Sequence, residues 1–271
     1  MILGSIAPKE IYPDDTYLSG ETNKKALILV AHDDDAATFS GTTSMLSANG
    51  WDVDFVCFYT DQYRPEEVPT RKLEMEKVSE LIGFKNMDLI DFTMAGRSIP
   101  SAGPGCRYSY DQFPVRYKTD SLSGLIIEAI ERSRPSVIFM FDNVIGGYGH
   151  PEHVVLGRLT EEVCQARRDS SRFPVKDLHV CVPPSLAERV NETARYTFRV
   201  NLYTTAPGMP VPDVQVDIAS FGANKKKVFQ AHASQKRNLK KFIPYYNLYP
   251  GWIYFRIFGK EYFNVITIGS D

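Results

Sequence analysis

The chain alternates short apolar runs with segments of helical spacing, and this alternation restricts the possible folds more than any other feature. Residues 26–31 (ALILVA) form the continuous apolar run typical of a strand buried on both faces, and a helix is predicted over residues 39–49, ended by Gly50. The unit recurs, with strands predicted at residues 51–60, 87–92, 135–141 and 177–182 and helices at residues 70–82, 123–133 and 151–168. This order predicts an α/β fold that is Rossmann-like, with a largely parallel sheet flanked by helices.

The pattern changes after residue 195, where a mixed α/β part is predicted. One helix is expected at residues 224–240, followed by a tail rich in Tyr, Phe and Trp. This tail could form the floor of a pocket, a subunit interface or part of the core. We favour core packing with a subunit interface, so a homo-oligomer is a possible state. No segment has the composition of a linker. Residues 1–271 are therefore predicted to form a single domain, in which a Rossmann-like core (1–195) is completed by residues 196–271.

Composition excludes several classes of partner. The chain has 31 basic and 33 acidic residues, so no global field attracts nucleic acid. No signal peptide is evident, and no segment approaches the ~18 to 20 apolar residues that span a bilayer, so we expect a cytoplasmic protein without a membrane segment. The four cysteines form no C-x-x-C pair, which argues against a disulfide framework or a thiolate zinc site. Cys57 and Cys181 are expected in the core.

Two segments at predicted strand ends carry most of the chemistry. Residues 27–41 (LILVAHDDDAATFSG) place His32 and three aspartates where the first strand ends, and residues 143–157 (NVIGGYGHPEHVVLG) follow a later strand. Three of the five histidines lie in these two segments. Ligands of open α/β sheets bind beyond the carboxyl ends of the strands. Neither G-x-G-x-x-G nor a P-loop motif is present, so a nucleotide phosphate is not the expected ligand.

A catalytic divalent metal takes three imidazole or carboxylate ligands and keeps a position for water, and His32, Asp35 and His153 can supply that set. Taken singly, each of these residues is more often structural, but two clusters at two strand ends favour a metal. Asp34 would point away from the ligands and accept a proton from water. In the competing assignment Asp33 is the base, Asp34 the ligand and Asp35 a helix cap.

The two segments together resemble a known family. AHDDDA followed by a helix, with GGYGHPEH later, is similar to the LmbE-like/PIG-L family of metal-dependent N-acetylglucosamine deacetylases, whose signatures read A-H-P-D-D-E and H-P-D-H. TDQ, TRKLEMEKVSELIGF and AHASQ (residues 60–62, 70–84 and 231–235) extend the similarity over most of the chain. The resemblance implies hydrolysis of an N-acetyl amide on an amino sugar or a glycoconjugate.

The resemblance also implies roles for individual residues. His32, Asp35 and His153 would bind one zinc, or another divalent metal such as Fe(II), Co, Ni or Mn. Asp34 would be the general base, while His150 would stabilise the oxyanion and protonate the leaving amine.

Further positions of the family pattern concern the substrate and the surroundings of the metal. Tyr148 would lie over the substrate carbonyl, Arg71 would contact the substrate, and Glu152 would support a metal-binding histidine. Asp33 and Ala36 depart from the family, which has proline and glutamate there. Asp33 is therefore expected to be the aspartate whose substitution is tolerated. These departures keep a carbohydrate-binding pseudoenzyme as the alternative function. A metal phosphoesterase is a weaker rival, because it would usually need more bridging acids.

Residues 94–118 form a long segment rich in Gly and Pro without helical or strand spacing, which is typical of a functional loop. Arg107 and Tyr108 in it are expected to bind the sugar, and an ordinary surface loop is the alternative. Of the remaining histidines, His179 is expected to be buried and His232 to make a structural hydrogen bond.

Overall fold

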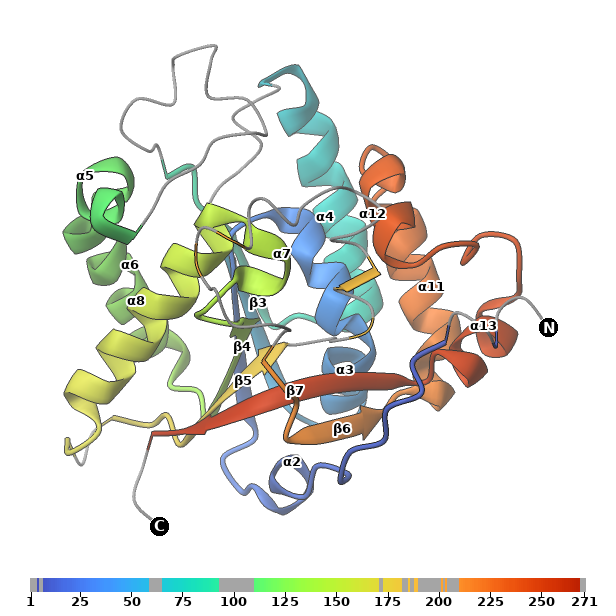
Figure 1. Ribbon diagram of the computed structural model, residues 1–271, viewed down its shortest axis with the longest axis horizontal. Helices are drawn as coiled ribbons and strands as arrows, with labels where there is room; N and C mark the ends of the chain where they lie inside the picture. Colours follow the sequence, from blue (N-terminus) through green and yellow to red (C-terminus); the bar gives the residue numbers. More distant parts are fainter. Residues whose placement is uncertain are drawn as a thin grey trace.

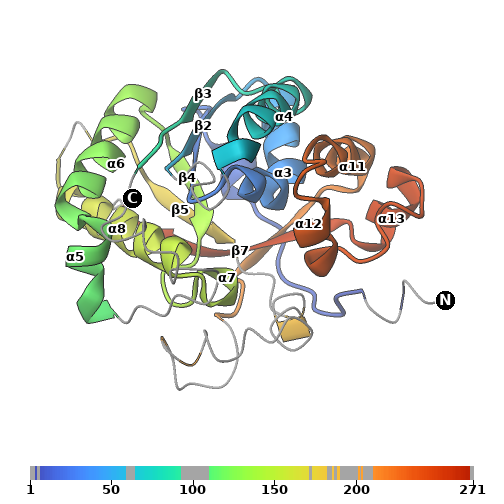
Figure 2. The ribbon, with the colours of Figure 1, turned by 90° about the horizontal axis from the view of Figure 1, so that it is seen from above.

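A computed structural model of the chain describes residues 7–58, 65–92, 110–170, 173–181 and 210–268, together with residues 4, 185, 188, 189, 201 and 203. In this part of the chain a seven-stranded sheet has the order β3-β2-β1-β4-β5-β7-β6. β1 to β5 run parallel, whereas β7 is antiparallel to β5 and β6. Helices cover both faces of the sheet (Figures 1 and 2). The predicted α/β fold with a largely parallel sheet is confirmed.

The strands are β1 (Lys25–Val30), β2 (Asp52–Cys57), β3 (Asn86–Leu89), β4 (Val137–Phe141), β5 (Asp177–Cys181), β6 (Val214–Asp217) and β7 (Lys260–Thr267). One helical layer contains α5 (Phe113–Tyr117), α6 (Thr119–Ser133) and α8 (Pro151–Arg167). The other contains α3 (Ala36–Ala48), α4 (Val68–Ile82), α11 (Gly222–Ala231), α12 (Lys236–Phe242) and α13 (Gly251–Ile257). Two further short helices are α2 (Tyr17–Gly20) and α7 (Gly146–Gly149), and 3-10 turns lie at Asp33–Asp35, Pro65–Glu67, Tyr110–Gln112 and Ala219–Phe221.

The central strands β1 and β4 are almost entirely apolar, as expected of strands that helices cover on both faces. In β1 the five residues after Lys25 are fully buried, and β4 is buried throughout. β3, at the edge of the sheet, is exposed or half-buried at every position. Cys57, Cys181 and His179 are buried as predicted, and His179 lies 3.0 Å from a carboxylate oxygen of Asp15.

The sheet reverses its order between β1 and β4. The chain moves outward from β1 to β2 and β3, then returns to add β4 on the other side of β1. Ligands of open α/β sheets bind at such a point, beyond the carboxyl ends of the strands. His32 follows β1, and the segment that leads to His150 follows β4. Both segments singled out in the sequence therefore lie at the reversal.

The single helix predicted at residues 224–240 is wrong, because the structure has two helices there with a break at residues 232–235. The backbone N–H and the hydroxyl of Ser234 both donate to the Glu74 carboxylate, each at 2.8 Å. This carboxylate from α4 offers the backbone a partner outside the helix, which explains the break. Residues 196–205, at the start of the predicted mixed part, lie outside the described residues except for residues 201 and 203.

A buried ion pair ties the C-terminal part to α3. Glu261 on β7 pairs with Lys225 on α11, and both side chains are nearly inaccessible. The Glu261 carboxylate also accepts the backbone N–H groups of Gly41 and Thr42 at 2.9 and 2.8 Å, while Lys225 donates to the carbonyl of Thr38 at 3.0 Å. α3 follows directly from the turn that carries the three aspartates, so this pair fixes the helix behind the site.

No helix in the described part of the chain is long and apolar enough to cross a membrane.

We expect Glu261→Ala to lower the free energy of unfolding by about 3 kcal/mol or more, because it leaves Lys225 buried without its counter-charge and removes an acceptor of two buried amides. Urea unfolding measures the change. Asp52→Ala is the matched control, since it breaks the exposed ion pair with Lys85 and should cost about 1 kcal/mol or less. Equal losses in the two variants would contradict a structural role for the buried pair.

Candidate active site

The aspartate run forms a tight turn that directs its side chains to different places. His32 is extended (φ −122°, ψ 155°), and Asp33–Asp35 form a single 3-10 turn before α3 begins at Ala36. The backbone N–H of His32 donates to the Asp35 carboxylate at 2.8 Å, so this side chain folds back toward the histidine. α3 starts three residues earlier than predicted because the turn continues directly into it.

The second segment is held by Asp142, a residue that the sequence analysis did not single out. Its carboxylate accepts the backbone N–H groups of Val144, Ile145 and Gly147 at 3.0, 2.7 and 2.6 Å. Burial raises the pKa of Asp142, and these hydrogen bonds offset part of that effect. In the sequence, Asp142 directly follows the apolar run VIFMF and precedes a glycine pair, and this pattern could have indicated its role.

The glycine turn packs directly against α8. Gly146 has φ +56°, and a Cβ there would lie 2.5 Å from the Cβ of His153. The residue must therefore be glycine for the turn to approach α8 this closely. Its carbonyl lies 3.0 Å from His153 Nδ1. The turn thus sets the orientation of the imidazole ring.

Three side-chain atoms of the predicted ligand set face one another. His32 Nδ1 lies 3.1 Å from His153 Nε2 and 3.5 Å from Asp35 Oδ2, and His153 Nε2 lies 3.2 Å from the same oxygen. Tetrahedral zinc with bonds of ~2.0 to 2.1 Å holds neighbouring ligand atoms roughly 3.3 Å apart. The spacing of the three atoms fits one such ion.

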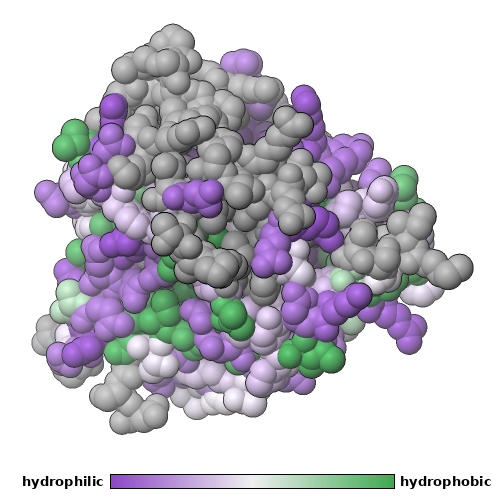
Figure 3. Space-filling view, viewed as in Figure 1, coloured by the Kyte–Doolittle hydropathy of each residue, from purple (hydrophilic) through white to green (hydrophobic). Residues whose placement is uncertain are grey.

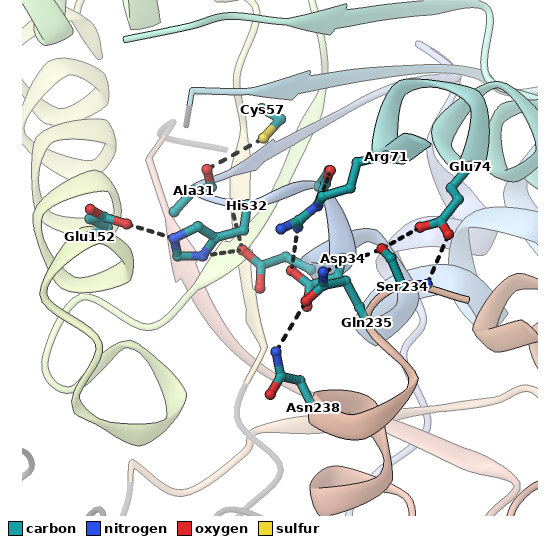
Figure 4. Close-up of polar contacts among 12 residues, drawn as sticks. Ala31, His32, Asp34, Cys57, Arg71, Glu74, Glu152, Ser234, Gln235 and Asn238 are labelled. Carbon is teal, nitrogen blue, oxygen red and sulfur yellow. Dashed lines mark hydrogen bonds and ion pairs between the residues drawn. The ribbon is translucent and has the colours of Figure 1, made fainter. Parts of the chain in front are cut away.

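The outer nitrogen of each histidine has an acceptor of its own. Glu152 Oε2 lies 2.5 Å from His32 Nε2 (Figure 4), and the Gly146 carbonyl faces His153 Nδ1. If these nitrogens carry the N–H groups, His32 Nδ1 and His153 Nε2 present lone pairs to each other. Two lone pairs at 3.1 Å repel unless a proton or a metal cation lies between them. The donor chemistry of the residues therefore fits a bound cation.

The electrostatics of the cluster favour positive charge. Burial lowers the pKa of His32, but its hydrogen bonds to Asp35 and Glu152 outweigh burial and raise that pKa to about 10. Burial raises the pKa of Asp35, and the two histidines outweigh this and hold it well below its usual range. The acids that retain a proton on His32 would equally attract a divalent cation, which competes with that proton.

His150 and Tyr148 lie on the open side of the cluster. The His150 ring centroid is 4.7 Å from that of His32 and 4.9 Å from that of His153. The three histidines offer nitrogen atoms within 4.8 Å of one another, a spacing that could hold a metal ion, so His150 adjoins the predicted ligand set and is itself a candidate ligand. Tyr148 packs edge-on against both His150 and His153.

Asp33, which stands at the family's proline position, binds the arginine expected to contact substrate. Arg71 Nε donates to Asp33 Oδ2 at 2.8 Å and Nη2 donates to the other oxygen, while Nη2 lies 3.5 Å from Asp34 Oδ1. Burial lowers the pKa of Arg71 to about 10. Burial and then the charge of Asp35 raise the pKa of Asp34 to about 6. Arg71 is thus held beside the expected base by a partner 38 positions away, a pairing without a local sequence signal.

His232 is buried near Arg71 and Asp35. Burial, followed by the charge of Arg71, lowers its pKa to about 3, so the ring is neutral at physiological pH. In the described part of the chain its Nε2 has no hydrogen-bond partner. The expected structural hydrogen bond is therefore absent at that nitrogen.

A pocket of about 950 Å³ opens over these groups. Part of its lining comes from His32, Asp34, Asp35, Arg71, Tyr148 and His150. His153 and Glu152 are buried behind them. Other walls come from α12, α13 and β7. Arg107 and Tyr108, predicted to bind the sugar, lie outside the described residues.

Known proteins share this fold. Over 249 residues the chain is 24% identical to 1D-myo-inositol 2-acetamido-2-deoxy-alpha-D-glucopyranoside deacetylase of Thermobifida fusca (strain YX), covering 79% of this chain and 84% of that protein. N,N'-diacetylchitobiose deacetylase from Pyrococcus horikoshii has a TM-score of 0.54 at 19% identity, covering 96% of this chain and 95% of that one. GalB, the 4-carboxy-2-hydroxymuconate hydratase from Pseudomonas putida KT2440, has a TM-score of 0.58 at 15% identity, covering 90% and 96%. Because a hydratase and a deacetylase share this fold, the fold alone does not determine which reaction a protein of this kind catalyses.

The family comparison covers the part of the chain that forms the site. The model described as PIG-L, GlcNAc-PI de-N-acetylase, matches residues 27–164. This range contains both segments at the reversal of the sheet, from the aspartate turn to α8. The chain belongs to the PIG-L family.

Proposed function

We propose that the protein is a metal-dependent hydrolase that removes the acetyl group from an N-acetylglucosamine-type sugar or its conjugate. The observation that carries the proposal is the set of three facing ligand atoms, His32 Nδ1, Asp35 Oδ2 and His153 Nε2, 3.1 to 3.5 Å apart. Asp34 lies beside them in the pocket wall. The relatives named as deacetylases of N-acetylated sugars support the same reaction.

His32, Asp35 and His153 would hold one divalent ion, with zinc as the first expectation and Fe(II), Co, Ni or Mn as alternatives. Two imidazoles and one carboxylate suit these metals. When bound, such an ion lowers the pKa of water to about 7 and polarises an acyl oxygen. Glu152 would orient His32 through its Nε2, as the Gly146 carbonyl would orient His153.

Asp34 would accept the proton of the attacking water. Its pKa is raised to about 6. A general base with a pKa slightly below the working pH is mostly ionised and still accepts a proton readily. His150 would face the developing oxyanion and then protonate the leaving amine, so that the amide C–N bond breaks to give acetate and a free amino sugar. Tyr148, next to His150, would contact the acetyl carbonyl.

The substrate is proposed from the pocket and the relatives. A volume of about 950 Å³ is at the upper end of small-molecule sites, so it has room for a sugar with a sizeable substituent. The identity of that substituent, a cytoplasmic location and a homo-oligomeric state stay predictions. In the alternative, a carbohydrate-binding pseudoenzyme, the same pocket would bind the sugar without hydrolysing its amide.

Acetate release tests the reaction directly. Metal-stripped protein with added zinc is incubated with a panel of N-acetylglucosamine derivatives that includes an inositol conjugate and N,N'-diacetylchitobiose. Acetate and a free amine should appear in equal amounts from at least one of them. Sugar binding without acetate release from any derivative would support the pseudoenzyme instead.

The three aspartates should separate metal binding from catalysis. Asp34→Asn is expected to keep the metal and to lose about 100-fold or more in kcat, because an amide cannot accept the water proton. Asp35→Asn should bind less metal, since it removes an anionic ligand. Elemental analysis and turnover, measured side by side, distinguish them. A metal-poor Asp34→Asn beside a metal-replete Asp35→Asn would contradict the assignment.

His150→Ala is expected to lower kcat by about 100-fold or more at nearly unchanged metal content, because the variant lacks the oxyanion partner and acid but keeps the proposed ligands. His153→Ala is the matched comparison, since it should reduce metal content as well. A parallel loss of metal in both variants would show that His150 is a ligand.

The sequence suggested that substitution of Asp33 is tolerated, but its ion pair with buried Arg71 predicts a loss of stability. Asp33→Asn removes the counter-charge of buried Arg71, so we expect a loss of about 3 kcal/mol in the free energy of unfolding. Adding Arg71→Met should recover much of that stability, because the buried charge is then gone. Asp88→Asn, which breaks an exposed pair with Arg132, is the control with little expected loss. Urea unfolding of all four proteins checks this, and a stable Asp33→Asn would refute the role of the pair.

A further inference from the structure

The charges of the chain are distributed very unevenly. Residues 218–260 contain nine basic residues and no acidic residue, whereas the other parts of the chain contain 22 basic and 33 acidic residues. The near-neutral total therefore hides a strongly cationic segment within an acidic protein. This segment lies outside residues 27–164, the range that the family model matches.

The cationic segment forms one end of the molecule. It contains α11, α12 and α13, which lie side by side in both ribbon views (Figures 1 and 2). Six of its cations are exposed, namely Lys227, Lys236, Arg237, Lys240, Lys241 and Arg256. On α12 they occupy positions four residues apart, so they share sides of the helix. Buried Lys225 already pairs with Glu261, and Lys260 with Asp217.

Large apolar side chains are exposed among these cations. Tyr245, Leu248, Trp252 and Ile257 are 48, 67, 63 and 40% exposed. They are four of the nine large apolar residues exposed in the described part of the chain, and they lie within 13 positions. Trp252 and Arg256 are four residues apart on α13, so they share a side of that helix. Hydrophobic and hydrophilic side chains also adjoin each other at this end in the space-filling view (Figure 3).

We propose that the face formed by α11, α12, α13 and the loop between α12 and α13 (residues 243–250) docks on the surface of an anionic lipid bilayer. Lys and Arg near a membrane are attracted by acidic headgroups. Trp and Tyr prefer the interface between headgroups and acyl chains, and Leu and Ile gain by entering it. Both kinds of side chain occur together on this face.

Two other partners fit this face less well. A single-stranded nucleic acid would use the cations and stack on Trp252 or Tyr245, but it would gain little from exposed Leu248 and Ile257. A symmetric contact with a second copy would bring six cations against six, which is repulsive. The combination of charge and aliphatic exposure therefore favours the bilayer.

The docking face adjoins the pocket. Arg237, Lys241 and Ile257 line the pocket as well as being exposed. A protein bound by this face would therefore hold one wall of the pocket at the membrane surface. Amphiphilic substrates carried in that surface would then lie near the pocket.

Vesicle binding tests the proposal without any measurement of activity, so its failure is separable from failure of the proposed reaction. The intact protein is sedimented with phosphatidylcholine vesicles that contain or lack about 30% phosphatidylglycerol, at low and at high salt. Binding should require the anionic lipid and weaken as salt rises.

Two variants examine the two contributions, and neither alters a residue that lines the pocket. The triple substitution Lys236→Glu, Lys240→Glu and Arg256→Glu should weaken vesicle binding by about 100-fold or more. The pair Leu248→Ala and Trp252→Ala should weaken it by about 10-fold. Matched controls change the same number of exposed residues elsewhere, with Lys24→Glu, Lys85→Glu and Arg168→Glu for the triple and Leu73→Ala and Val115→Ala for the pair.

Controls that bind like the parent, together with losses in both test variants, would support the proposal. Equal binding to neutral vesicles, equal losses in the controls, or no vesicle binding would overturn it. Binding of single-stranded RNA in place of anionic vesicles would assign the face to nucleic acid. Concentration-dependent self-association that Leu248→Ala and Trp252→Ala abolish, without vesicle binding, would assign it to a second copy.

Discussion

The parallel pairing of β1 with β4 is the constraint on which the site depends. It places the carboxyl ends of two strands that are more than a hundred residues apart in the chain at the same edge of the sheet. His32 leaves one end and the turn before His153 leaves the other, so two imidazole nitrogens meet at 3.1 Å. A one-residue shift of this register would turn the side chains of a strand to the opposite face and separate the two halves.

Buried ion pairs hold the side chains of the site in place and shift their pKa values. Asp35 and Glu152 flank His32, while Asp33 holds Arg71 beside Asp34. Each buried ion is costly without a partner, so the residues stabilise one another as a set. The negative field at His32 would attract a cation, and burial with the nearby Asp35 raises the pKa of Asp34. Structural pairing and the proposed catalysis therefore use the same side chains.

The C-terminal part contributes in two ways that differ in burial. Inside the molecule, Lys225 and Glu261 fix α3 behind the aspartate turn. At the surface, the same segment has six exposed cations and four exposed large apolar residues, and two of the cations, Arg237 and Lys241, line the pocket. This separation explains how a segment with no acidic residue of its own is stable, because its one deeply buried lysine finds its acid on β7.

The sequence alone determined the α/β class, the central strands and the two segments at the sheet reversal, because continuous apolar runs and local motifs do not depend on distant partners. Only the tertiary structure decided what the aspartates do. Asp33 was expected to be tolerant, but it is paired with Arg71 on another helix. The break at residues 232–235 depends on Glu74, far away in the chain. Such contacts join residues whose spacing carries no periodic signal, so packing had to bring them together before their roles were visible.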